Sequence, residues 1–229
     1  MNAKILEIFQ SIQGEGKFAG VRQVFVRFFE CNMHCVWCDT PHSIGDSKKE
    51  YTQYSLAELS GVVAGMARHC HSVSLTGGEP LLQKDFIAEF IPFLKKMNLP
   101  VYLETNGIFH QELKEIIDGV DIVAMDFKLP SSTQCRPYWD EHERFLTVAR
   151  QKDVFVKAVI TSATREEDLR RTVEIIKKVH PETLLILQPN YFEMNNGVMQ
   201  RCRELHEVCL ERLPHVRILP QVHKFMKLK

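Results

Sequence analysis

The chain repeats short apolar runs rich in β-branched residues, and amphipathic segments lie between them. The runs that predict strands are Val24–Phe28, Val73–Thr76, Val101–Glu104, Ile122–Asp126, Phe155–Ile160, Leu184–Gln188 and Val216–Leu219. Strands that alternate with helices are typical of a parallel sheet covered by helices. About six such units fit in 229 residues, fewer than the eight of a closed barrel. The pattern therefore predicts an α/β fold, a partial (β/α)6-type TIM barrel.

Two of the expected helices carry a start signal. Ser55 with Glu58 and Thr164 with Glu167 each match a capping box, in which the first side chain caps the helix and the glutamate bonds back. Helices are therefore expected to begin directly after Ser55 and Thr164.

Length and charge limit the kinds of protein that fit. A chain of 229 residues with 45% hydrophobic residues suits one domain, residues 1–229. Lys and Arg balance Asp and Glu at 29 each, which disfavours a nucleic acid or an anionic membrane as partner. No export signal or membrane-spanning run is visible, so we expect a cytoplasmic protein.

Three of the seven cysteines, Cys31, Cys35 and Cys38, lie in the run CNMHCVWCDT. Three thiolates on one loop can hold three corners of an iron–sulfur cube and leave the fourth iron open to another ligand. A structural zinc site needs four protein ligands, which His34 or His42 would have to complete. The spacing favours the cluster. The remaining cysteines are expected to be structural, and Cys202 and Cys209 belong to one apolar helical stripe.

Polar motifs follow several of the predicted strands. They are Thr76–Pro80 (TGGEP), Glu104–Gly107 (ETNG), Asp126–Lys128 (DFK) and Gln188–Pro189, and the cysteine loop follows Val24–Phe28. The carboxyl ends of parallel strands carry the active site in barrels of this kind. We therefore expect these motifs to meet in one site.

Together the motifs resemble a known family. CxxxCxxC is the signature of the radical S-adenosylmethionine (SAM) superfamily, and the chain is similar over its whole length to the 7-carboxy-7-deazaguanine synthases. The likeness rests on Phe9–Gly16 with QGEG, Phe25–Arg27, Trp37–Thr40, Thr76–Pro80, Glu104–Gly107, Leu187–Pro189 and Pro220–Lys224 with QxHK. It implies a partial barrel of the radical SAM type and a lyase of queuosine and 7-deazapurine synthesis. That lyase contracts 6-carboxy-5,6,7,8-tetrahydropterin to 7-carboxy-7-deazaguanine and releases ammonia.

The resemblance also implies cofactors and their residues. Cys31, Cys35 and Cys38 would be the catalytic ligands of a [4Fe–4S] cluster, whose open iron holds the amine and carboxylate of SAM. The SAM contacts would be Trp37, Cys38, Asp39, Gly78, Asp126, Phe127, Lys128, Gln188, Pro189, Asn190 and Tyr191. Thr40 resembles the position that binds Mg²⁺, a cation that prefers oxygen ligands, although a threonine before Pro41 could instead cap a turn.

The substrate would be held by residues from both ends of the chain. They are Ile12, Gln13, Gly14, Glu15, Arg27, Thr76, His223 and the terminal carboxylate of Lys229, the last two in the segment 220–229. Arg27 also stands out physically, because a guanidinium in the apolar strand VFVRFF needs an anion. That anion is either the carboxylate of the substrate or an internal Asp or Glu.

Two residues depart from the family pattern. Glu30 stands before Cys31 where many members have Gly, and Asp126-Phe127-Lys128 replaces a frequent Ser-Pro-Lys. The second change makes the SAM contacts of Asp126 and Phe127 less secure.

Other functions remain open at the level of the sequence. A radical SAM activase for a glycyl radical on a partner protein would share the cysteines, as would a non-enzymatic iron–sulfur electron carrier or sensor. The lyase would need an electron donor such as flavodoxin or ferredoxin, and the family suggests a homodimer.

Overall fold

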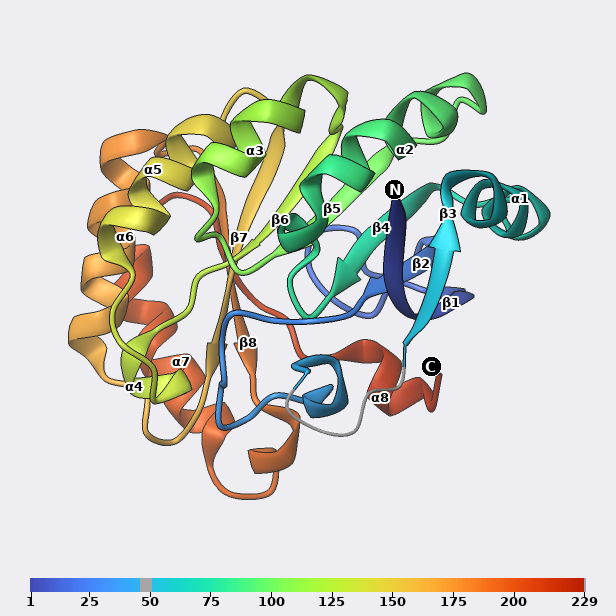
Figure 1. The fold of residues 1–229 in the computed structure, drawn as a ribbon. Helices are drawn as coiled ribbons and strands as arrows, with labels where there is room; N and C mark the ends of the chain where they lie inside the picture. The colour runs from blue at the N-terminus through green and yellow to red at the C-terminus, as the bar shows by residue number, and fades with distance from the viewer. Residues whose placement is uncertain (46–50, 229) are drawn as a thin grey trace.

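The computed structural model describes residues 1–45 and 51–228, and within them nine strands form one curved sheet (Figure 1). The strands are β1 (Asn2–Ile12), β2 (Arg22–Phe28), β3 (Thr52–Ser55), β4 (Ser72–Gly77), β5 (Val101–Thr105), β6 (Ile122–Asp126), β7 (Asp153–Ile160), β8 (Leu184–Pro189) and β9 (Val216–Ile218). Their order in the sheet is β3-β1-β2-β4-β5-β6-β7-β8-β9. All seven predicted strands are present.

From β2 to β9 each strand pairs in parallel with its neighbour, whereas β1 is antiparallel to both β2 and β3. The predicted partial (β/α) barrel is therefore confirmed. The sequence reading missed β1 and β3. Only Ala3 and Ile5 of β1 are buried, so this strand lacks the continuous apolar run by which the central strands were recognised.

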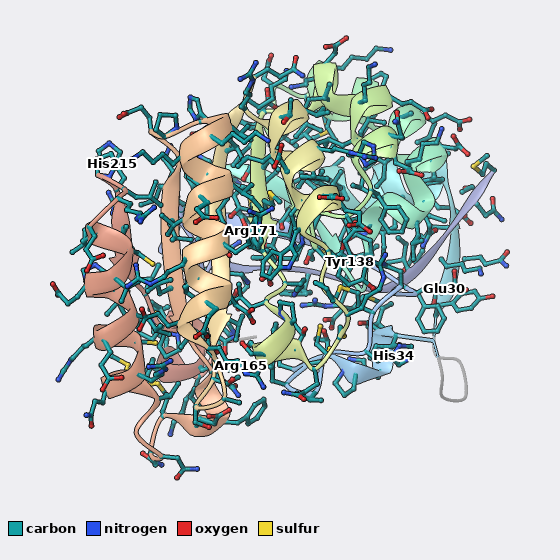
Figure 2. The ribbon with its side chains drawn as sticks, turned by 90° about the vertical axis from the view of Figure 1, so that its left-hand side faces the viewer. Glu30, His34, Tyr138, Arg165, Arg171 and His215 are labelled. Atoms are coloured by element: carbon teal, nitrogen blue, oxygen red, sulfur yellow. The ribbon has the colours of Figure 1, made fainter. Side chains whose placement is uncertain are left out.

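Helices cover the outer face of the sheet, and short helices lie in the loops at the carboxyl ends of the strands (Figure 1). The helices are α1 (Leu56–Met66), α2 (Lys84–Lys96), α3 (His110–Ile116), α4 (Pro130–Thr133), α5 (Trp139–Ala149), α6 (Glu166–Val179), α7 (Val198–Leu210) and α8 (Val222–Met226), with 3-10 turns at Pro41–Ser43, Pro80–Gln83, Ile117–Gly119 and Tyr191–Glu193. Figure 2 shows this helical layer from the side, with Arg171 of α6 on the surface.

One of the two predicted capping boxes is confirmed. The Ser55 hydroxyl accepts the backbone N–H of Glu58, and the glutamate accepts the N–H of Ser55. The prediction at Thr164 is wrong, because α6 is capped from Arg165 with no side-chain bond. The Thr164 hydroxyl instead accepts the N–H of Thr161 in the loop after β7, at 2.8 Å.

The apolar core has two parts. The larger lies between the sheet and the helices and includes Cys202 and Cys209 of α7, as the apolar stripe predicted. The smaller lies inside the curve of the sheet and contains Tyr102, Ala124 and Phe155. These three side chains come from β5, β6 and β7 and also line the cavity described below, so the inner cluster forms its floor.

In the part of the chain that is described, no helix has both the length and the apolar character needed to cross a membrane.

Candidate active site

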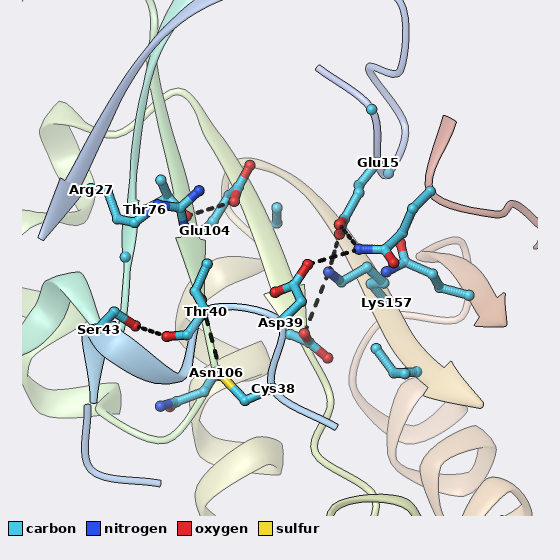
Figure 3. Close-up of a pocket in the computed structure, with 18 of the residues that line it drawn as sticks. Glu15, Arg27, Cys38, Asp39, Thr40, Ser43, Thr76, Glu104, Asn106 and Lys157 are labelled. Atoms are coloured by element: carbon cyan, nitrogen blue, oxygen red, sulfur yellow. Dashed lines mark hydrogen bonds and ion pairs between the residues drawn. The ribbon is translucent and has the colours of Figure 1, made fainter. Parts of the chain in front are cut away.

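A cavity of about 450 Å³ opens at the carboxyl ends of the parallel strands, where the sequence predicted a site. Most of the predicted site residues line it: Ile12, Gln13, Gly14, Glu15, Arg27, Cys31, Cys35, Trp37, Cys38, Asp39, Thr40, Thr76, Gly78, Asp126, Lys128, Gln188, Asn190 and His223. Parallel pairing aligns the carboxyl ends of β2 and β4 to β8, whereas the loop after the antiparallel β1 reaches the site through the hydrogen bond from the N–H of Val222 to the Gly14 carbonyl. Figure 3 shows part of this wall.

The three cysteines of the loop are free thiols, and each is partly buried in the cavity wall. The loop is held by its backbone: the N–H of Cys31 donates to Ile44, that of Cys38 to Cys35, and that of Val36 to Thr133, the last residue of α4. His34 of the loop is exposed, whereas Glu30 before it is half-buried; both are labelled in Figure 2. Burial raises the pKa of Cys31, and it raises that of Cys35 to about 12. Thiolates at these sites require a compensating cation, which the iron of a cluster provides.

The end of β4 packs directly against the cysteine loop. A Cβ atom on Gly78 would lie 2.1 Å from the carbonyl oxygen of Glu30 and 3.0 Å from Cβ of Cys31. Glu30 has a φ of 81°, a left-handed backbone conformation that favours glycine. The Glu30 side chain pairs with Lys4 at 2.7 Å.

Glu79 joins the ends of β4 and β5 beneath the cavity. Its fully buried carboxylate accepts the N–H of Asn106 at 2.8 Å, the Thr105 hydroxyl at 2.9 Å and the N–H of Leu81 at 3.1 Å. Burial raises the pKa of Glu79 to about 7 although these bonds favour the charged form. The TGGEP motif thus fixes the ETNG turn.

On one side of the cavity, Lys128 lies between Asp126 and Trp37. Its Nζ is 2.8 Å from Asp126 Oδ2 and 4.7 Å from the centre of the Trp37 ring. Oδ1 of Asp126 and Oε1 of Gln188 are buried acceptors with no partner among the described residues. Buried acceptors are normally bonded, so both oxygens suit a ligand that carries N–H donors, such as the ammonium group of SAM.

Next to Asp126, Glu15 pairs with Lys157 and with the C-terminal segment (Figure 3). Nζ of Lys157 is 2.5 Å from Glu15 Oε2, and Nε2 of Gln221 donates to Glu15 Oε1 at 2.7 Å. Burial alone would raise the pKa of Glu15, but the charge and hydrogen bond of Lys157, with Gln221, lower it to about 2. Glu15 is therefore an anion at neutral pH.

The N- and C-terminal segments meet at Gly14. A Cβ atom here would lie 2.1 Å from Nδ1 of His223, and the Gly14 carbonyl accepts the N–H of Val222 at 2.8 Å. The QGEG and QxHK motifs therefore form one wall. Burial lowers the pKa of His223.

Polar side chains also form a network along the inner face of β4 and β5. Oε1 of Glu104 accepts Gln13 at 2.7 Å and Ser74 at 3.2 Å, while Oε2 accepts the hydroxyl of Thr76 at 2.8 Å. The carbonyl oxygen of the Gln13 side chain accepts the N–H of Glu15 at 3.0 Å. This network holds the loop after β1 in place.

Arg27 lies in the cavity wall with an internal partner. Its Nε is 2.8 Å from Oε1 of Glu7 on β1, so the ion pair considered as an alternative is present. Thr40 stands at the start of the turn Pro41–Ser43, but its hydroxyl makes no capping bond. The capping alternative for Thr40 is therefore not supported.

Some predicted residues do not line the cavity. Ala124, Asp126 and Lys128 face it, so Phe127 points to the other side of the strand, where its ring lies 4.1 Å from that of His142. Gln188 and Asn190 face the cavity, whereas Pro189 and Tyr191 are not part of its wall. The resemblance predicts contiguous contacts in these segments, but side chains alternate along a strand, so only every second residue faces the cavity. Lys229 lies outside the described residues.

The sequence analysis did not identify Lys157 or Glu7 as residues of the wall, and it named Glu104 and Gln221 only as parts of motifs. Lys157 stands in the apolar strand FVKAVI, and the argument applied to Arg27 would have identified it.

A curved sheet with three thiols on one loop at its mouth defines the class of radical SAM enzymes, and the model of the Radical SAM superfamily matches residues 26–188. The chain is 39% identical, over 98% of its length and 97% of the relative's, to a 7-carboxy-7-deazaguanine synthase of Geobacter sulfurreducens. It is 32% identical to one of Thermoplasma acidophilum, with 97% and 96% covered. The chain belongs to the 7-carboxy-7-deazaguanine synthase family.

The solved structure of QueE from Escherichia coli has the same fold, with a TM-score of 0.68, 22% identity and coverage of 97% of this chain and 95% of that one. Membership of the superfamily gives the chain its [4Fe–4S] cluster and SAM as cofactors. The chain is a radical SAM lyase of 7-deazapurine synthesis. The named relatives favour this function over that of a glycyl-radical activase or an electron carrier.

Proposed function

We propose that the chain converts 6-carboxy-5,6,7,8-tetrahydropterin to 7-carboxy-7-deazaguanine and ammonia. The observation that supports this reaction best is that Arg27 and the three thiols of the cysteine loop line one cavity of about 450 Å³. That volume suits a small molecule bound beside a cofactor.

The cofactor half of the cavity holds the groups expected for a cluster and SAM. We assign the cluster to Cys31, Cys35 and Cys38. We assign SAM to the wall of Trp37, Asp39, Gly78, Asp126, Lys128, Gln188 and Asn190. When bound, these two groups supply the chemistry that removes a hydrogen atom from the substrate. The protein orients them, and Gly78 allows β4 to pack closely against the cysteine loop.

The substrate half matches a carboxylated pterin. Arg27 carries five donors, more than Glu7 alone can accept, and its fork fits the carboxylate of the substrate. Glu104 has about four acceptor positions, of which three described donors occupy three. The fourth suits an N–H of the aminopyrimidinone ring. We assign the rest of this half to Ile12, Gln13, Gly14, Glu15, Thr76 and His223.

Two further contacts complete the proposal. Thr40 would bind Mg²⁺ together with oxygens of the substrate, because its hydroxyl is not used as a cap. The contact predicted for the carboxylate of Lys229 lies outside the described residues, and Leu228 before it lines the cavity.

We further propose one domain of residues 1–229, which receives its electron from flavodoxin or ferredoxin and acts as a homodimer. All seven cysteines are described and are free thiols, which suits the reducing cytoplasm.

Anaerobic incubation with iron, sulfide, dithionite, SAM, Mg²⁺ and 6-carboxytetrahydropterin tests the function by product analysis. We expect 7-carboxy-7-deazaguanine and ammonia. Cys35→Ala should abolish product, whereas Cys70→Ala, a thiol outside the loop, should retain it. A protein that assembles no cluster and holds stoichiometric zinc would contradict the proposal, as would 5′-deoxyadenosine without any conversion of the pterin.

A further inference from the structure

Lys157 of β7 lies between two carboxylates from the two halves of the cavity. Its Nζ is 2.5 Å from Glu15 Oε2 on the substrate side and 3.4 Å from Asp126 Oδ2 on the cofactor side. The Lys157 side chain is only 17% exposed. One ammonium group therefore contacts two carboxylates that are more than a hundred positions apart in the sequence.

The contacts continue in both directions from Lys157. Asp126 pairs with Lys128, whose ammonium lies over the ring of Trp37. Glu15 accepts Gln221, which also donates to Asp39 Oδ2 at 3.2 Å. Trp37 and Asp39 flank Cys38. This series of cation–π, ionic and hydrogen-bonded contacts thus begins and ends next to Cys38, a proposed ligand of the cluster. Lys157 lies at the centre of the series.

Lys157 is also required by charge. Without it, Asp126 would keep its ion pair with Lys128, whereas Glu15 would keep the hydrogen bond of Gln221 but no ion pair among the described residues. A buried carboxylate that loses its partner rearranges or takes up a proton, and either change alters the groups around it. Loss of Lys157 should thus alter the surroundings of Asp126 on the cofactor side and of Glu15 on the substrate side together.

We propose that Lys157 is a positioning residue that couples the binding of SAM to the binding of the substrate. It acts through Asp126 and Glu15, and it holds both carboxylates as anions in one arrangement. The inference rests on the proposed function, since it takes Glu15 to lie against the pterin.

The test measures the dissociation constants of SAM and of the carboxypterin by calorimetry, on cluster-loaded protein without oxygen. In the natural protein, SAM should tighten pterin binding about fivefold or more, a typical coupling between sites. In Lys157→Met this factor should fall below about two, and both ligands should bind more weakly. Lys157→Arg keeps the charge and should restore part of the coupling.

A double-substitution cycle distinguishes a specific interaction between Lys157 and Glu15 from a general loss of structure in the site. Lys157→Met and Glu15→Gln should each weaken pterin binding. The double variant should bind the pterin about as weakly as the single variant with the larger loss, because both changes break the same ion pair between Lys157 and Glu15. Lys17→Met is the matched control, since Lys17 also pairs with a residue of β7, Asp153, but at the surface. It should leave both constants unchanged.

The outcomes are distinct. Additive effects in the cycle, or coupling retained in Lys157→Met, overturn the role of Lys157. The same holds if SAM does not affect pterin binding in the natural protein. If no pterin binds at all, the proposed substrate is wrong, and the dissociation constant of SAM then tests the role of Lys157. It rises in Lys157→Met if Lys157 positions Asp126, and it stays unchanged if Lys157 does not.

Discussion

Replacing Gly78 by alanine should separate the end of β4 from the cysteine loop. The added Cβ would lie 2.1 Å from the Glu30 oxygen, whereas ordinary contact begins at 3.4 Å, so the backbone must move by about 1 Å. Glu30 cannot yield easily. Its N–H donates to Ser43 at 2.8 Å, its carbonyl accepts the N–H of Glu79 at 2.8 Å, and its side chain binds Lys4.

Overpacking of this kind costs about 1–3 kcal/mol, and loss of the hydrogen bond from Glu79 adds about 1 kcal/mol. We therefore expect Gly78→Ala to lower the free energy of unfolding by about 2–4 kcal/mol. The variant should also lose iron, because Cys31 directly follows Glu30. Urea unfolding of the cluster-free protein and iron content after reconstitution measure the two effects.

Gly65→Ala is the matched control. Gly65 lies inside α1, and a Cβ there would meet nothing within 4 Å. Alanine should stabilise this helix by about 0.5–1 kcal/mol. A Gly78→Ala protein that unfolds like the natural one and holds a full cluster would refute the packing argument.

Arg27→Ala should raise the KM for the carboxypterin roughly tenfold to a hundredfold, the worth of a charged hydrogen bond, with the absorbance of the cluster intact. An unchanged KM would remove Arg27 from the site. Complete chelation of divalent cations should abolish activity, and activity that survives would refute the Mg²⁺ at Thr40. His142 is fully buried, and burial lowers its pKa from 6.5 to about 4. The unfolded chain therefore takes up a proton first, and stability present above pH 6.5 is lost as the pH falls toward 4. Between pH 7 and 5 the natural protein should lose about 2 kcal/mol more than His142→Phe in urea unfolding, and equal losses would contradict this.

Much of the fold could be read from local pattern. Each central strand is buried on both faces, so its apolar run is continuous and easily recognised. Ser55 and Glu58 lie within one turn of each other, which makes their capping box a local property. The capping box predicted at Thr164 is absent, because its hydroxyl accepts the backbone N–H of Thr161 instead of an N–H of the helix.

The site could be predicted only in part, because sequence patterns report only contacts between residues that are close in the chain. The cysteine loop is local, and its spacing alone indicates the cluster. Phe127 shows the limit: it stands between two residues that face the cavity, yet the two-residue period of the strand turns its side chain into the core. A buried strand gives no sign in its sequence of which face is the inner one.

The sequence by itself determined the parallel α/β framework, the three thiols on one loop and the motifs at the strand ends. Only the tertiary structure decided which charges meet. Lys157 pairs with Glu15, 142 residues away, and Arg27 finds Glu7 on the antiparallel strand β1 that the pattern did not reveal. Local patterns depend on neighbours within a few residues. Ion pairs across a curved sheet depend on the register and curvature of all its strands, which are properties of the folded chain as a whole.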